Sequence, residues 1–95
     1  MRDGSLVCTG KGNAEWNCSA PHGAGRLLSR TQAKESITLT AFKEAMKGVY
    51  SSSITKGTID ESPQAYKPAR EIIAAIGDTV TINAVIRPIY NFKAV

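Results

Sequence analysis

The 95-residue chain is 42% hydrophobic and 21% charged, which is the balance of a globular protein rather than of a disordered tail. A chain of this length forms one domain at most and buries only about 60–65% of its unfolded surface, so we expect marginal stability. No run approaches the roughly 20 apolar residues needed to cross a membrane. The formal net charge of +4 is compatible with a polyanionic partner, although the basic residues are scattered and form no tail.

The cysteines and the first residues indicate the compartment. Cys8 and Cys18 are too few for a disulfide scaffold, and no Cys-x-x-Cys pair or His/Cys cluster suggests a zinc site. Met1 is followed at once by Arg2-Asp3-Gly4, without the apolar segment of a signal peptide. We therefore expect reduced thiols and a cytoplasmic protein.

The first half of the chain predicts one strand and two helices. Residues 4–9 are apolar at their centre and predict a short buried strand. Trp16 lies in the polar loop that follows, where simple packing is favoured over stacking on a base. Helices are predicted over residues 26–34 and 38–46, the second with a threonine cap at its start and a glycine after its end.

The second half adds further short elements. We predict a strand at residues 48–51, a helix that begins within residues 60–67, a helix at 69–76 and a strand at 79–87. In the first of these helices Ser62 suits the cap and Pro63 the first helical position, with the acids Asp60 and Glu61 just before. The last strand alternates apolar and polar residues with a period of two. The fold class is therefore α+β, with short strands and three to four helices.

Residues 17–30 contain the only histidine in the sequence, His22. Two glycines just after it leave the backbone open to a ligand. If a helix begins at residue 26, its free N–H groups and its dipole favour an anion beside His22. Arg26 and Arg30 add guanidinium groups suited to bidentate contact with phosphate. These residues predict an imidazole beside a phosphate site, although a generic glycine-rich turn explains His-Gly-x-Gly equally well.

The longer string Ser-Ala-Pro-His-Gly-Ala-Gly-Arg-Leu-Leu-Ser-Arg, residues 19–30, closely resembles the signature of the RtcB family of GTP-dependent RNA ligases. Further segments are similar to family patterns in the same order: residues 1–13, Pro-x-Ala-Tyr-Lys at 63–67, and the C-terminal pattern at 88–93. The resemblance covers essentially the whole chain. It implies that residues 1–95 are the C-terminal portion of an RtcB-like domain and not a complete domain.

The resemblance implies a ligase that joins RNA 3′-phosphate or 2′,3′-cyclic phosphate ends to 5′-hydroxyl ends, as in tRNA splicing and RNA repair. His22 would be the nucleophile that takes GMP from GTP. The implied GTP-binding residues are Ser5, His22, Gly23, Ala24, Gly25, Tyr66 and Lys93, and the implied substrate-phosphate residues are Arg26 and Arg30. Two plainer interpretations stay open, in which Tyr66 only packs on its helix and Lys93 is a solvated terminal residue.

The family binds manganese through an aspartate, a cysteine and several histidines upstream of the signature, whereas His22 is the only histidine here. The resemblance therefore implies that the manganese ligands lie in a missing N-terminal portion, and that this chain alone does not ligate RNA. The alternatives are a non-catalytic phosphate- or RNA-binding module derived from the ligase, and a truncated remnant that never folds stably. For an unrelated enzyme using His22 as a general acid or base, no acidic partner is identifiable from spacing.

Overall fold

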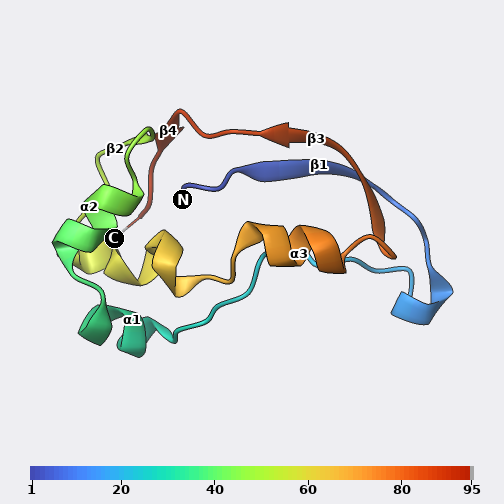
Figure 1. Cartoon of the computed structure of the whole chain (residues 1–95), viewed down its shortest axis with the longest axis horizontal. Coiled ribbons are helices and arrows are strands. Elements are labelled where there is room, and N and C mark those ends of the chain that lie inside the picture. Colours follow the sequence, from blue (N-terminus) through green and yellow to red (C-terminus); the bar gives the residue numbers. More distant parts are fainter. Residues whose placement is uncertain (95) are drawn as a thin grey trace.

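The computed structural model describes residues 1–94, and in it short strands pair segments that are far apart in the sequence (Figure 1). β1 (Ser5–Gly10) pairs antiparallel with β3 (Val80–Ile86), and β2 (Tyr50–Ser51) pairs parallel with β4 (Tyr90–Asn91). Three α-helices lie between these strands in the described chain: α1 (Arg30–Ser36), α2 (Leu39–Ala45) and α3 (Ala69–Ala75). Three 3-10 helices complete the elements of residues 1–94: η1 (Ala14–Trp16), η2 (Lys56–Glu61) and η3 (Pro63–Ala65). The predicted α+β class is confirmed.

The β1–β3 ribbon confirms both predicted strands but not the predicted burial of the first. Only Leu6 of β1 is even half-buried, and the other five residues of the strand are exposed. On β3, Val80 is buried, whereas Val85 and Ile86 are more than half exposed. A two-stranded ribbon buries a face only where another layer packs on it. The described residues provide no such layer over the end of the ribbon that carries Val85 and Ile86. The expectation that residues 4–9 form a buried strand was therefore wrong.

α1 begins four residues later than predicted. Gly25 has φ +78°, and Arg26 is extended and forms an isolated β-bridge with Tyr66, so neither residue can enter a helix. Ser29 caps the helix instead: its hydroxyl accepts from the backbone of Gln32, and the Gln32 side chain accepts from the backbone of Ser29. His22 therefore does not lie just before a helix N-terminus, and the expected contribution of a helix dipole at this loop is wrong.

α2 carries the best-packed part of the molecule. The Thr38 hydroxyl caps α2 by accepting from the backbone N–H of Ala41, which confirms the predicted threonine cap. Phe42 and Met46 are almost completely buried and form the core with Ile59. Partly buried side chains pack around this core: Met1, Ile37, Leu39, Val49 and Ile54.

Residues 56–67 differ from the helix predicted to begin within residues 60–67. They form η2 and η3 with extended backbone at Ser62, whose φ and ψ are −58° and 143°. Pro63 does occupy the first position of η3, but this helix ends after one turn because Tyr66 is extended and bridges to Arg26. α3 confirms the helix predicted at 69–76, with Ile76 buried at its end. No helix within residues 1–94 has the length and apolar character that crossing a membrane requires.

Candidate functional site

The loop that carries His22 is fastened to the segment around Tyr66. The backbone N–H groups of Leu27 and Leu28 both donate to the carbonyl of Ala65, at 2.8 and 3.2 Å. The N–H of Lys67 donates to the carbonyl of Gly25 at 3.0 Å. Two sequence patterns separated by more than thirty residues, the glycine-rich signature and Pro-x-Ala-Tyr-Lys, therefore lie side by side.

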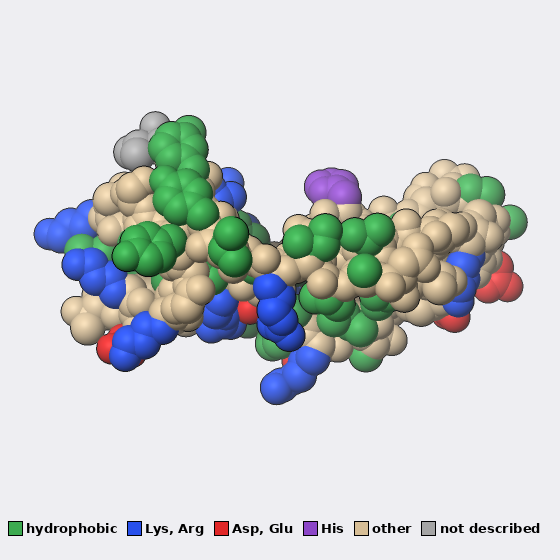
Figure 2. All heavy atoms as spheres, turned by 90° about the horizontal axis from the view of Figure 1, so that it is seen from above, with side chains coloured by type: hydrophobic (Ala, Val, Ile, Leu, Met, Phe, Trp, Pro, Cys, Tyr) green, Lys and Arg blue, Asp and Glu red, His purple; other side chains and the backbone are tan. Residues whose placement is uncertain are grey.

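His22 itself projects from the surface (Figure 2). Its ring is exposed, and among the residues that the structure describes it has neither a hydrogen bond nor an ion pair. Nothing in this part of the chain orients the imidazole or hides it from solvent. An exposed, unrestrained imidazole is accessible to an incoming phosphate, but its orientation would have to come from that ligand or from other contacts.

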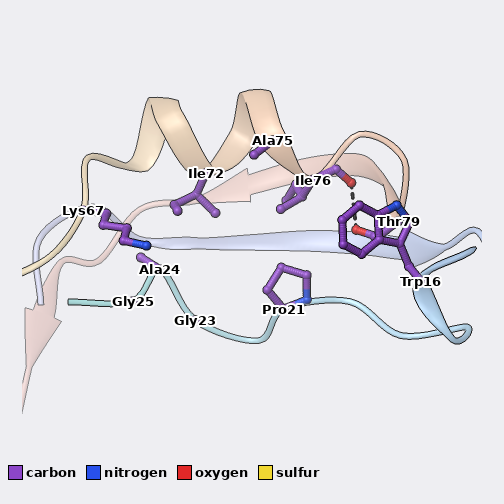
Figure 3. Close-up of a pocket in the computed structure, with 10 residues that line it drawn as sticks. All are labelled: Trp16, Pro21, Gly23, Ala24, Gly25, Lys67, Ile72, Ala75, Ile76 and Thr79. Carbon is purple, nitrogen blue, oxygen red and sulfur yellow. Dashed lines mark hydrogen bonds between the residues drawn. The ribbon is translucent and has the colours of Figure 1, made fainter. Parts of the chain in front are cut away.

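A groove runs beside the His22 loop, with a volume of about 310 Å³ (Figure 3). It is lined by Trp16, Pro21, Gly23, Ala24, Gly25, Lys67, Ile72, Ala75, Ile76 and Thr79. Trp16 stands at one end and Lys67 at the other, with α3 along one side. Trp16 is 56% exposed, so the ring does little of the packing expected of it. The volume is at the lower end of the range for small-molecule sites.

Several charged and polar side chains gather around the carboxylate of Glu61. This group, here called the Glu61 cluster, consists of Arg26, Arg30, Asp60, Glu61, Tyr66 and Lys93. The Tyr66 hydroxyl donates to Glu61 Oε2 at 2.7 Å, and Arg30 Nη1 donates to Oε1 at 2.8 Å. Lys93 Nζ lies 3.7 Å from Oε2. Asp60 gives Arg30 a second carboxylate partner. Two predicted guanosine residues, Tyr66 and Lys93, thus meet at one acid.

The contacts of this cluster shift two pKa values in opposite directions. The hydrogen bond from Tyr66 and the charges of Arg30 and Lys93 outweigh partial burial and lower the pKa of Glu61 to about 2. Burial and the hydrogen bond to Glu61 raise the pKa of the Tyr66 phenol above its usual value. Both residues therefore keep fixed protonation states across the neutral range, a carboxylate beside a phenol.

Arg26 links the His22 loop to this cluster. Its Nε donates to the carbonyl of Leu28 at 2.9 Å, Nη1 donates to the Tyr66 hydroxyl at 3.1 Å, and Nη2 donates to the carbonyl of Asp60. The guanidinium also lies over the Tyr66 ring, 4.8 Å from its centroid. A phosphate at Arg26 would have to share donors that the fold already uses, whereas the Arg30 side chain is 64% exposed and reaches solvent. The predicted phosphate roles of both arginines stay predictions.

Lys93 is held by more than its ammonium group. Its backbone N–H donates to Ser53 Oγ at 2.9 Å, and that hydroxyl donates back to the Lys93 carbonyl at 3.2 Å. Ser53 is buried, so this pair fixes the C-terminal segment against the body of the molecule. Lys93 is therefore anchored, and the plainer interpretation of a freely solvated residue does not describe it.

The nine predicted site residues do not form one pocket. Ala24, Gly23 and Gly25 line the groove, whereas Tyr66 and Lys93 belong to the Glu61 cluster with Arg26 and Arg30. Ser5 is exposed at the start of β1, opposite Ile86, and no described contact joins it to either place. Sequence reasoning missed Glu61 and Lys67. Lys67 is the last residue of the Pro-x-Ala-Tyr-Lys pattern, and Glu61 lies two residues before that pattern, where an acid five residues before a tyrosine was the available signal.

A manganese site does not fit the residues that are present. Between residues 1 and 94, no three His, Cys, Asp or Glu side chains gather closely enough to hold a metal ion. His22, Cys8 and Cys18 are each exposed, and both cysteines are free thiols.

Comparison with known proteins identifies the family. The family model described as tRNA-splicing ligase RtcB matches residues 1–94, and the chain belongs to this family. RNA-splicing ligase RtcB of Escherichia coli K12 is 37% identical over 95 residues, which cover 94% of this chain and 22% of that protein. The tRNA-splicing ligase RtcB of Aeropyrum pernix is 36% identical over 97 residues, covering 94% of this chain and 20% of its own length. The chain thus spans about a fifth of the relatives' length. No solved structure matches it.

Proposed function

We propose that this chain is the C-terminal part of a GTP-dependent RNA ligase that joins RNA 3′-phosphate or 2′,3′-cyclic phosphate ends to 5′-hydroxyl ends in the cytoplasm. The observation that carries the proposal is the fastening of the His22 loop to the Tyr66 segment through the Ala65 carbonyl and the Gly25–Lys67 contact. It places the candidate nucleophile loop beside the segment that carries Tyr66. Family membership supports the same reaction class.

The chemistry we assign to His22 has three steps. The imidazole attacks the α-phosphorus of GTP; a P–N bond forms, the bond to the leaving oxygen breaks, and pyrophosphate departs. The RNA 3′-phosphate then attacks the same phosphorus and takes the GMP, which frees His22. Finally the RNA 5′-hydroxyl attacks the activated 3′-phosphate, forms the new phosphodiester and expels GMP. The exposed position of His22 leaves room for both the nucleotide and the RNA end.

The binding residues have distinct proposed parts. Tyr66 offers a flat ring and Lys93 an ammonium group to guanosine, and the backbone at Ala24 and Gly25 faces the groove, where a ribose or phosphate could approach closely. Arg30 retains exposure for RNA or triphosphate oxygens. Ser5 is exposed at the start of the β1–β3 ribbon. It would contact guanosine only if the chain rearranged or if the bound nucleotide itself reached the ribbon.

We also propose that activity requires further polypeptide, as the greater length of the relatives suggests. Exposed apolar side chains support a partner surface, and several gather on the face shown in Figure 2. The exposed apolar side chains of the described residues include Val7, Tyr50, Val85, Ile86, Ile89, Tyr90 and Phe92. Manganese and its ligands would belong to that other part, and the described residues offer no cluster of their own.

The test supplies the missing part. The chain is mixed with the portion of the E. coli relative that it does not match, together with manganese, radiolabelled GTP and RNA carrying the two ends. We expect acid-labile transfer of GMP to the mixture and joined RNA, with neither product in the chain alone. His22→Ala should abolish both, because alanine offers no nucleophile. RNA joining by the His22→Ala mixture would refute the proposed role of His22.

A second function rests on the exposure of His22 and of the Arg30 side chain. A chain that presents both to solvent would bind phosphate or RNA as a non-catalytic module. Filter binding distinguishes the two, with RNA ending in a 3′-phosphate compared against RNA ending in a hydroxyl. Preference for the 3′-phosphate without GMP transfer in the reconstituted mixture would favour the module.

A further inference from the structure

We propose that Glu61 is a positioning residue of the guanosine site, one that sets the places of Tyr66 and Lys93 relative to each other. This inference rests on the proposed function, because it assigns a role within the proposed nucleotide site. Glu61 belongs neither to the glycine-rich signature nor to the predicted ligands. Its role follows from the contacts that its carboxylate makes.

Both oxygens of the Glu61 carboxylate are used, and by different segments. Oε2 accepts from the Tyr66 hydroxyl at 2.7 Å and lies 3.7 Å from Lys93 Nζ, while Oε1 accepts from Arg30 at 2.8 Å. Tyr66 lies five residues along the chain, but Lys93 comes from the C-terminal segment. One carboxylate therefore connects the two predicted guanosine residues, which the chain itself keeps apart.

The Glu61 carboxylate can connect Tyr66 and Lys93 because the backbone at residue 61 is fixed. Glu61 ends η2, and its neighbours Asp60 and Ser62 are buried. The backbone N–H of Ser62 donates to the carbonyl of Ile59, itself part of the core with Phe42. The Glu61 side chain is only 19% exposed, so little solvent competes for its oxygens. It is a fixed acceptor on a packed turn.

Tyr66 and Lys93 differ in how strongly their positions depend on the Glu61 carboxylate. Tyr66 is restrained a second time, because Arg26 donates to its hydroxyl and covers its ring. The Lys93 side chain is 39% exposed and has four rotatable bonds, and Glu61 is the only carboxylate that the described residues offer it. Without Glu61, the Lys93 ammonium would sample many positions. Binding of a nucleotide would then have to order the Lys93 side chain, and the entropy lost in doing so would weaken binding. Loss of the carboxylate should weaken nucleotide binding without removing a nucleotide contact.

The experiment measures GTP affinity with a fluorescent GTP analogue in the chain and three variants. Glu61→Gln keeps the size of the side chain but removes its charge, and Glu61→Asp keeps the charge on a shorter stem. Glu44→Gln is the matched control, since Glu44 is exposed on α2, pairs with Lys47 and makes the same change in net charge. We expect about a tenfold or greater loss of affinity in Glu61→Gln, partial recovery in Glu61→Asp and no change in the control.

A second readout separates positioning from general loss of structure. The ring of Tyr66, labelled with carbon-13 and assigned by Tyr66→Phe, reports its hydroxyl environment by NMR without any nucleotide. Glu61→Gln should shift this resonance and lower the pKa of the Tyr66 phenol, since the acceptor charge is gone, while the Phe42 resonances stay in place. Displaced Phe42 resonances would mean that Glu61 merely supports the fold, and would overturn the inference.

The outcomes also distinguish this inference from the proposed function. If the unmodified chain binds GTP and Glu61→Gln binds it equally well, the positioning role is wrong and the nucleotide site stands. If the unmodified chain binds no GTP, alone or with the complementary part of the E. coli relative, the nucleotide site falls and the positioning role falls with it. Weakened binding in Glu44→Gln equal to that in Glu61→Gln would reduce the effect to net charge and refute the specific role.

Discussion

Replacing Arg26 tests whether this arginine serves the fold or the substrate. The structure commits all three of its donor nitrogens to the carbonyls of Leu28 and Asp60 and to the Tyr66 hydroxyl. Family resemblance instead implies contact with phosphate. Arg26→Ala removes every interaction, whereas Arg26→Lys keeps the positive charge but lacks the planar fork that reaches three acceptors at once.

The expected loss of stability follows from these contacts. Two hydrogen bonds to backbone carbonyls contribute about 1 kcal/mol each, and the contact with the Tyr66 ring and hydroxyl about 1 kcal/mol more. Arg26→Ala should therefore lower the free energy of unfolding by about 3 kcal/mol, and Arg26→Lys by about 2 kcal/mol because one amine replaces one of the bonds. For a domain of this size, about 3 kcal/mol corresponds to a fall in Tm of roughly 12–24 °C.

Thermal unfolding followed by circular dichroism measures this effect. Arg70→Lys is the matched control, because Arg70 is exposed on α3 and the same replacement there should change the unfolding free energy by less than about 0.5 kcal/mol. The structural reasoning is refuted if Arg26→Lys and Arg26→Ala both unfold at the temperature of the unmodified chain. If they also bind RNA ends more weakly, Arg26 acts on the substrate, as the resemblance implies.

Three further predictions concern stability. The pKa of Glu61 is lowered to about 2, so its ionised form stabilises the folded chain above about pH 4.5, and this contribution is lost as the pH falls toward 2; the Tm advantage over Glu61→Gln should shrink over that interval. Phe42→Ala, at a side chain with no exposed surface, should cost about 3–5 kcal/mol in chemical denaturation and leave little folded protein. Ser29→Ala removes the capping box of α1 and should cost about 1 kcal/mol, whereas Ser19→Ala in the exposed loop should cost less than about 0.5 kcal/mol.

Local patterns predicted the elements whose signals lie within a few residues. The threonine cap and the spacing of Phe42 and Met46 predict α2, and alternation predicts β3. Ser29 and Gln32 carried an equally local signal, a serine followed three residues later by a glutamine, that fixes the start of α1. The helix predicted over residues 26–34 leaves out this cap and therefore begins too early.

The candidate site could be predicted only in part, because its contacts join distant segments. The extended conformation of Arg26 depends on its bridge to Tyr66, which no helix propensity encodes. The resemblance predicts guanosine-binding roles for Tyr66 and Lys93, but it does not point to the carboxylate between them. No residue near Glu61 in the sequence points to Lys93, and only the return of the C-terminal segment makes the two residues partners.

The pairing of β1 with β3 has a consequence for how the chain folds. Ser5 lies opposite Ile86, so the ribbon joins nearly the first and nearly the last of the described residues. Contacts between such distant positions form slowly, because almost the whole intervening chain must be closed into a loop first. During synthesis β1 is made before β3 and stays without this partner until β3 follows. Until then the backbone groups of β1 and the side chains of Leu6 and Val7 stay open to pairing with other chains, which exposes β1 to aggregation.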